Sequence, residues 1–109
     1  MRTIIRSEEF DAFYTALDTK VQQKVDYALY ILSELKVVNT KLAKKLQSSD
    51  FYELRISTGN EYRVIMFTID SESLIEATQI LLLNGFMKKS SKDYKKETDK
   101  ATRILEKYL

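Results

Sequence analysis

The chain has 109 residues, of which 44% are apolar and 31% charged, and its formal net charge is +2. This length predicts one domain (1–109) with a single modest core. Histidine and cysteine are both absent, which excludes disulfides, thiol nucleophiles and Cys-type zinc sites, and we expect no metal or cofactor. No apolar run could span a membrane and the N-terminus has no signal-peptide pattern, so we expect a cytoplasmic protein without membrane contact.

The positive charge is concentrated toward the C-terminal end. Residues 1–35 contain four Lys or Arg against six Asp or Glu, whereas residues 85–109 contain eight against four. A locally basic surface favours a phosphate-bearing or acidic partner. A solvated, lysine-rich helix face would give the same pattern, so both interpretations stay open.

The first third of the chain predicts a strand followed by a helical hairpin. Arg2–Arg6 is short and β-branched, which is typical of a strand. Ser7, with two glutamates behind it, predicts the start of a helix. Asp18 or Thr19 can cap a second helix, whose apolar residues recur at three- and four-residue steps as far as Leu35. We interpret this apolar stripe as core.

The remainder predicts a loop, three strands and a last helix. Residues 36–50 are polar with few apolar anchors and predict a loop with a short helical turn. Strands are expected at Phe51–Ile56, Glu61–Asp70 and Leu74–Leu83, and a helix at Asp93–Leu109. The order β-α-α-β-β-β-α predicts an α+β domain in two layers. In it, the helical hairpin and the C-terminal helix cover one face of an antiparallel sheet.

The turn at 58–60 predicts the register of the first hairpin. A three-residue loop places apolar residues together on one face, in the pairs Tyr52–Met66, Leu54–Val64 and Ile56–Tyr62. The same register places Arg55 opposite Arg63 on the other face, where like charges repel. Two explanations remain: Glu53 or Glu61 neutralises the arginines, or the arginines are held for an anion.

The end of the third strand is the most informative segment. The strand is expected to end at Asn84-Gly85, and cations and aromatic residues follow up to the start of the last helix: Phe86, Lys88, Lys89, Lys92 and Tyr94. A strand end, a cationic cluster and a helix N-terminus together predict a phosphate site.

An ordered set of motifs runs through the second half of the chain: Lys44-Lys45-Leu46, Tyr52-Glu53-Leu54-Arg55, Glu61-Tyr62-Arg63-Val64, Leu82-Leu83-Asn84-Gly85-Phe86-Met87-Lys88-Lys89, and Lys96-Glu97 with Ala101. This set resembles the RelE/ParE toxin superfamily, and most closely its HigB-like branch of phage-derived, Gp49-like proteins. The resemblance implies a RelE-type fold and a type II toxin–antitoxin system. It implies cleavage of messenger RNA, commonly in the A site of the 30S ribosomal subunit. It also implies a HigA-like helix-turn-helix antitoxin, through which alone the toxin would contact operator DNA.

The resemblance assigns roles to individual residues. Metal-independent RNA cleavage needs a base for the ribose 2′-hydroxyl, cations for the phosphoryl charge and an acid for the leaving oxygen. Arg63 would clamp the phosphate, Lys88 or Lys89 would stabilise the phosphorane or protonate the leaving oxygen, and Tyr94 would be the base. A free tyrosine has a pKa of about 10, so we expect the neighbouring lysines to lower the pKa of Tyr94. Further candidate contacts with RNA, phosphate or the antitoxin are Arg55, Lys92, Phe86, Lys44 and Lys45.

Some positions depart from the family pattern. RelE carries lysines in the strand where this chain has Phe51 and Glu53, and Asn84 stands where related sequences often have histidine. Tyr94 could equally pack the last helix on the sheet, and the lysines could be solvated. Two alternatives therefore remain: a non-enzymatic, ParE-like toxin that inhibits DNA gyrase, and a degenerate toxin that acts only as an antitoxin-binding regulatory module.

Overall fold

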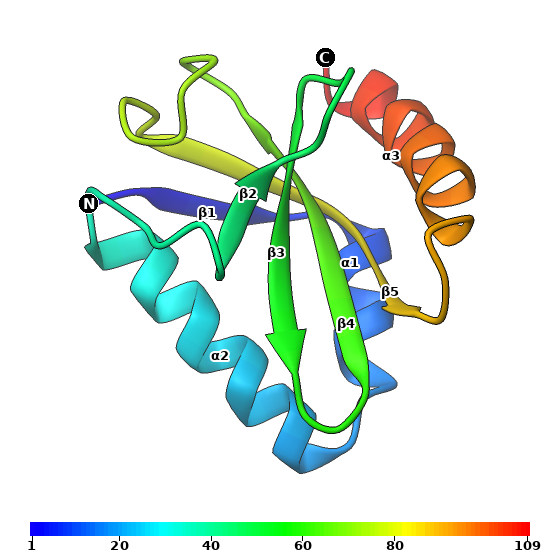
Figure 1. Ribbon diagram of the computed structural model, residues 1–109. Helices are drawn as coiled ribbons and strands as arrows, with labels where there is room; N and C mark the ends of the chain where they lie inside the picture. Colours follow the sequence, from blue (N-terminus) through cyan, green and yellow to red (C-terminus); the bar gives the residue numbers. More distant parts are fainter.

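Five strands form one sheet in the order β1-β5-β4-β3-β2, with three helices packed on it (Figure 1). The computed structural model describes all 109 residues. The elements are β1 (Thr3–Arg6), α1 (Glu8–Thr15), α2 (Thr19–Glu34), β2 (Ala43–Lys45), β3 (Phe51–Ser57), β4 (Glu61–Thr68), β5 (Gln79–Lys88) and α3 (Asp93–Tyr108). This is the expected α+β fold. None of the helices combines the length and hydrophobicity needed to cross a membrane.

The sheet differs from the expectation at both edges. The first strand, β1, pairs with β5 in parallel, so the sheet is mixed rather than purely antiparallel. The segment 36–50, expected to be a loop with a helical turn, contains β2, which pairs antiparallel with β3. A three-residue strand carries too short a pattern to be recognised from alternation.

The last strand begins and ends later than expected. Leu74 and Ala77 are buried but lie in the loop before β5, where the Asp70 carboxylate accepts hydrogen bonds from the backbone N–H groups of Thr78 and Gln79. β5 then continues through Asn84-Gly85 to Lys88, so the expected strand end at Asn84-Gly85 is wrong. The strand continues beyond Asn84 and Gly85 because both residues pair with residues of β4.

The helical hairpin starts where the sequence predicts. The Ser7 side chain accepts a hydrogen bond from the Phe10 N–H at 2.9 Å, and the Asp18 carboxylate accepts one from the Val21 N–H at 3.0 Å. Each cap satisfies a backbone donor that has no partner inside its helix. Both predicted helix starts are therefore confirmed.

The sheet is covered on both faces, in three layers. α1 and α2 pack on one face against residues such as Leu54, Val64 and Leu82. α3 packs on the other face, where Ala101 and Ile104 contact a separate apolar cluster that is made by Phe51, Ile65, Phe67, Leu81 and Leu83. Figure 1 shows α3 across the sheet from the hairpin. The expectation that all helices cover one face is wrong, because the strands carry apolar residues on both faces.

The predicted hairpin register is confirmed. Tyr52 lies opposite Met66, Leu54 opposite Val64, Ile56 opposite Tyr62 and Arg55 opposite Arg63. The apolar pairs face the helical hairpin, and the two arginines lie on the α3 face.

A bulge in β5 decides which side chains reach the α3 face. Ile65 pairs with Asn84 and Met66 with Leu82, so Leu83 is an extra residue in β5. Leu83 and Asn84 consequently both face α3. Beyond the bulge, Phe86 also lies on the α3 face, opposite Arg63.

Candidate functional site

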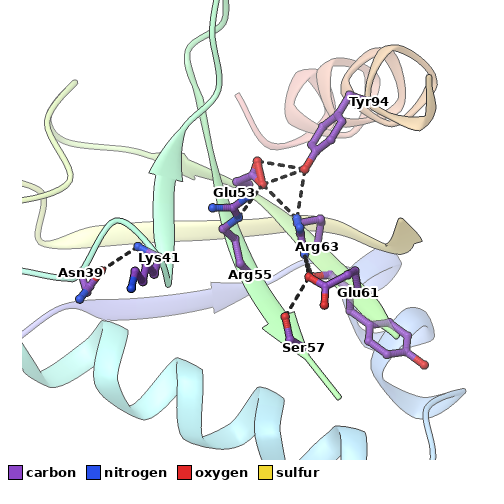
Figure 2. Close-up of polar contacts among 9 residues, drawn as sticks. Asn39, Lys41, Glu53, Arg55, Ser57, Glu61, Arg63 and Tyr94 are labelled. Carbon is purple, nitrogen blue, oxygen red and sulfur yellow. Dashed lines mark hydrogen bonds and ion pairs between the residues drawn. The ribbon is translucent and has the colours of Figure 1, made fainter. Parts of the chain in front are cut away.

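Glu53 is the centre of a polar cluster on the α3 face of the sheet (Figure 2). Its side chain is 6% exposed, and its carboxylate contacts three other side chains. The Oε1 atom lies 3.1 Å from Arg63 Nε and 3.5 Å from Arg55 Nε. The Tyr94 hydroxyl donates to Oε1 at 2.8 Å and to Oε2 at 3.1 Å. A single buried carboxylate therefore joins β3, β4 and α3.

Arg63 is buried and paired with acids. It is 3% exposed, its Nε donates to the Tyr94 oxygen at 3.1 Å, and its Nη1 donates to Glu61 Oε1 at 3.2 Å. Burial alone would lower the pKa of Arg63, but the hydrogen bonds to Tyr94 and Glu61 and the charge of Glu53 raise it. Of the two explanations for the facing arginines, neutralisation by Glu53 and Glu61 is the one that the contacts show.

Tyr94 lies in the first turn of α3 and is half-buried. Burial and the hydrogen bond to Glu53 raise its pKa, and they outweigh Arg63, which lowers it. The expectation that neighbouring lysines lower the pKa of Tyr94 is therefore wrong. The Lys88 ammonium lies over the Tyr94 ring, 5.5 Å from its centroid, and Lys89 and Lys92 are exposed.

The start of α3 is held in place by side chains on both sides of the loop that follows β5. The Asp93 carboxylate accepts hydrogen bonds from the N–H groups of Lys89 at 2.7 Å and Ser90 at 3.0 Å, and these bonds lower the pKa of Asp93. Buried Asn84 donates to the backbone oxygen and the carboxylate of Glu97. Asn84 thus anchors α3 and does not line the cleft described next.

An open cleft of about 370 Å³ lies between β2, β3 and the start of α3. Its lining residues are Lys44, Lys45, Leu46, Gln47, Glu53, Arg55, Tyr94, Lys95 and Thr98. The structure therefore brings together four predicted site residues: Lys44, Lys45, Arg55 and Tyr94. Four lining cations face one lining carboxylate, so the cleft suits an anion.

The other predicted site residues lie outside the cleft lining. Arg63 contacts Glu53 and Tyr94 without lining the cleft, and Phe86 packs edge-to-face on Tyr94 with 5.7 Å between the ring centroids. Lys88, Lys89 and Lys92 are also absent from the lining.

Two charged cleft residues, Glu53 and Lys95, were not among the predicted site residues. A signal for Glu53 exists in the sequence: it alternates with apolar Phe51 on a face that is not solvated, where a lone carboxylate requires partners.

A larger groove of about 680 Å³ lies between α2 and β3. It is lined by Lys20, Gln23, Lys24, Tyr27, Ala28, Ile31, Leu42, Arg55, Ile56 and Ser57, with no carboxylate among them. Arg55 lines both the groove and the cleft. Apolar residues make up a larger part of the groove lining than of the cleft lining. The groove contains one tyrosine, Tyr27, and its hydroxyl donates to no carboxylate, unlike that of Tyr94 in the cleft.

The comparisons with known proteins agree on one family and one fold. The family model described as "Phage derived protein Gp49-like" matches residues 12–106. No curated protein matches the chain. A chain of the intact E. coli RelBE toxin–antitoxin complex superposes with a TM-score of 0.63 at 15% identity, covering 83% of this chain and 100% of that one. A mutant of the E. coli toxin RelE in the free state gives 0.64 at 16% identity, covering 99% and 98%. The chain therefore belongs to the phage-derived Gp49-like family, and its fold is similar to that of E. coli RelE.

Proposed function

We propose that the protein is the toxin of a type II toxin–antitoxin system and cleaves messenger RNA in the A site of the 30S ribosomal subunit. The observation that carries this proposal is the cleft, where four cations and a tyrosine converge on a fold shared with the toxin RelE. The reaction is attack of a ribose 2′-hydroxyl on its own 3′-phosphate, which needs neither metal nor external water. Its place of action is the cytoplasm.

The cations have distinct roles in this reaction. Arg55, whose side chain is 34% exposed, can present its guanidinium to two phosphate oxygens at once. Lys44, Lys45 and Lys95 surround the same cleft and stabilise the charge that develops on the phosphoryl group. Lys88 or Lys89 protonates the leaving oxygen, and Phe86, packed on Tyr94, is available to stack on a base. Arg63 holds Tyr94 and Glu53 in place, and exposed Lys92 contacts the RNA backbone or the antitoxin.

The inhibitory partner in this proposal is a HigA-like helix-turn-helix antitoxin, which also connects the toxin to operator DNA. The match to a toxin–antitoxin complex supports such a partner. The groove beside α2 is a suitable surface for it, because apolar Tyr27, Ile31 and Leu42 lie among cations that no lining carboxylate neutralises. An acidic, amphipathic segment of the antitoxin would complement both properties. Since Arg55 lines the groove as well, such a segment would also reach a phosphate-binding residue.

A second candidate is a toxin or regulatory module without ribonuclease activity, either ParE-like and directed at DNA gyrase or purely antitoxin-binding. The observation in its favour is that Arg63 is occupied by Glu53 and Glu61. The raised pKa of Tyr94 adds to this, because it disfavours a tyrosinate base.

Expression in a bacterial host, with sequencing of transcript 5′ ends, distinguishes these functions. The main proposal predicts growth arrest with new cleavage sites in translated messages. The variant Lys44→Ala/Arg55→Ala should remove both, whereas Lys100→Ala, an exposed lysine of α3 outside the cleft, should remove neither. Arrest with intact transcripts and broken DNA would instead indicate a gyrase inhibitor. Normal growth would indicate a regulatory module.

A further inference from the structure

The hydrogen bonds around Tyr94 determine where its proton points. Arg63 Nε can only donate, and it donates to the Tyr94 oxygen at 3.1 Å. The single hydroxyl proton of Tyr94 is therefore directed at the Glu53 carboxylate, 2.8 Å away. One lone pair of the tyrosine oxygen has no protein partner. A hydroxyl that donates to this lone pair would complete a chain of two hydrogen bonds ending at Glu53.

We infer that Glu53 is the final proton acceptor of the RNA cleavage reaction and that Tyr94 relays the proton to it. This inference rests on the ribonuclease function proposed above. It removes a difficulty of that proposal, because a relay through neutral tyrosine requires no tyrosinate ion.

The 2′-oxygen forms a bond to phosphorus while its proton moves to the Tyr94 oxygen, and the original Tyr94 proton moves to Glu53. The bond between phosphorus and the 5′-oxygen breaks, and a lysine ammonium such as Lys88 protonates the departing oxygen. The products are a 2′,3′-cyclic phosphate and a 5′-hydroxyl. Glu53 then returns its proton to water, and the lysine regains one.

The other carboxylates near the site accept hydrogen bonds from side chains other than that of Tyr94. Glu61 accepts hydrogen bonds from Ser57 and Arg63, and Glu97 accepts one from Asn84. Glu53 is the one carboxylate that lines the cleft. Arg63 is a positioning residue in this scheme, since its Nε contacts both the Tyr94 oxygen and Glu53 and so fixes the direction of the relay.

An alternative role for Glu53 predicts the opposite effect of its substitution on the cleavage rate. A carboxylate held against two arginines could occupy the position of an RNA phosphate and so prevent the phosphate from binding. If Glu53 blocks the site, Glu53→Gln should tighten RNA binding and speed cleavage. If Glu53 accepts the proton, the same substitution should slow cleavage and leave RNA binding nearly unchanged.

The test is single-turnover cleavage of ribosome-bound messenger RNA by the full chain across a range of pH. Tyr94→Phe is the key variant because it keeps the Glu53–Arg63 ion pair. Together with Glu53→Gln and the variant that carries both substitutions, it forms a double-mutant cycle. The relay predicts that each single variant slows cleavage about 100-fold or more. The double variant should cleave RNA no more slowly than either single variant, because both residues act in the same proton transfer. Tyr14→Phe is the matched control, since Tyr14 also donates to a carboxylate, that of Asp26, at 2.8 Å.

Two readouts separate the relay from a structural role. Glu53→Gln should slow cleavage without weakening RNA binding, and added formate should restore activity to Glu53→Ala. Cleavage by folded Tyr94→Phe at the wild-type rate would overturn the relay while leaving the ribonuclease function intact. Faster cleavage by Glu53→Gln would also overturn it. If wild-type protein cleaves no RNA, the proposed function itself fails.

Discussion

Arg55 and Arg63 face each other directly across β3 and β4, and the same carboxylate oxygen of Glu53 lies within 3.5 Å of both. Two like charges at this spacing would weaken the hairpin. The buried Glu53 carboxylate offsets that repulsion. Glu53 therefore stabilises the fold in addition to its proposed role as proton acceptor.

Removing Glu53 should destabilise the protein strongly. Glu53→Ala leaves Arg63, 3% exposed, without its nearest buried counter-charge, and we expect the free energy of unfolding to fall by about 3 kcal/mol. Urea denaturation measures this loss. Glu53→Met/Arg63→Met should recover most of it, because neither charge is then buried unpaired. A loss below about 1 kcal/mol would mean that Glu61 neutralises Arg63 unaided.

The contribution of Tyr94 to stability should disappear at alkaline pH. Burial and Glu53 raise the pKa of Tyr94 in the folded protein above its unfolded value of about 10. The unfolded chain then releases its proton first, so the stabilisation is complete below about pH 10 and is lost as the pH rises through the folded pKa. The stability difference between wild type and Tyr94→Phe should be constant below about pH 10 and shrink as the pH rises above it. A constant difference, measured by urea denaturation at each pH, would contradict this expectation.

Gly85 should not tolerate a side chain. A Cβ at this position would lie 2.3 Å from a ring atom of Phe13 in α1, so one of the two elements has to move. We expect Gly85→Ala to cost about 1–3 kcal/mol in a thermal or urea denaturation experiment. Gly85→Ala/Phe13→Leu should lose less than the sum of the two single losses. Gly59→Asn is a suitable contrast, because space there is open and Asn tolerates its φ of +92°.

The groove beside α2 should matter for the antitoxin. Tyr27 and Tyr30 are similarly exposed, at 67% and 64%, but only Tyr27 lines the groove. If the groove receives the antitoxin, Tyr27→Ala should weaken binding roughly tenfold or more, as expected for an aromatic anchor. Calorimetric titration with the helix-turn-helix antitoxin of the proposed system measures the change. Tyr30→Ala should bind as tightly as wild type, and equal affinity for both variants would place the interface elsewhere.

Local patterns predicted local structure well. The caps at Ser7 and Asp18 and the Arg55–Arg63 register follow from side chains within a few residues of the feature, and all are confirmed. The parallel pairing of β1 and the position of α3 depend instead on contacts between distant segments. Apolar Ile65 and Phe67 lie on the same face of the sheet as Arg63, and α3 packs on that face.

The environment of Tyr94 was the least predictable part of the site. Lysines near it in sequence suggested a lowered pKa, but the hydroxyl contacts Glu53, which is 41 residues away in the chain. Such a pairing exists only once β3 and α3 are packed together. The same holds for Lys95, which shares the cleft with Lys44 and Lys45 from the opposite side.

The extra residue at Leu83 also determines how this chain should be aligned with its relatives. Side chains alternate along a strand, so a single inserted residue exchanges odd and even positions for the rest of β5. In a relative whose last strand has no bulge, the counterpart of Lys88 is found by placing a one-residue gap at Leu83. An ungapped alignment would match Phe86 and Lys88 to positions that point at the helical hairpin. Loss of the Leu83 codon would remove the bulge but keep Phe86 and Lys88 on the α3 face, because Asn84 would then alternate directly with Leu82 and the pairing with β4 would be unchanged.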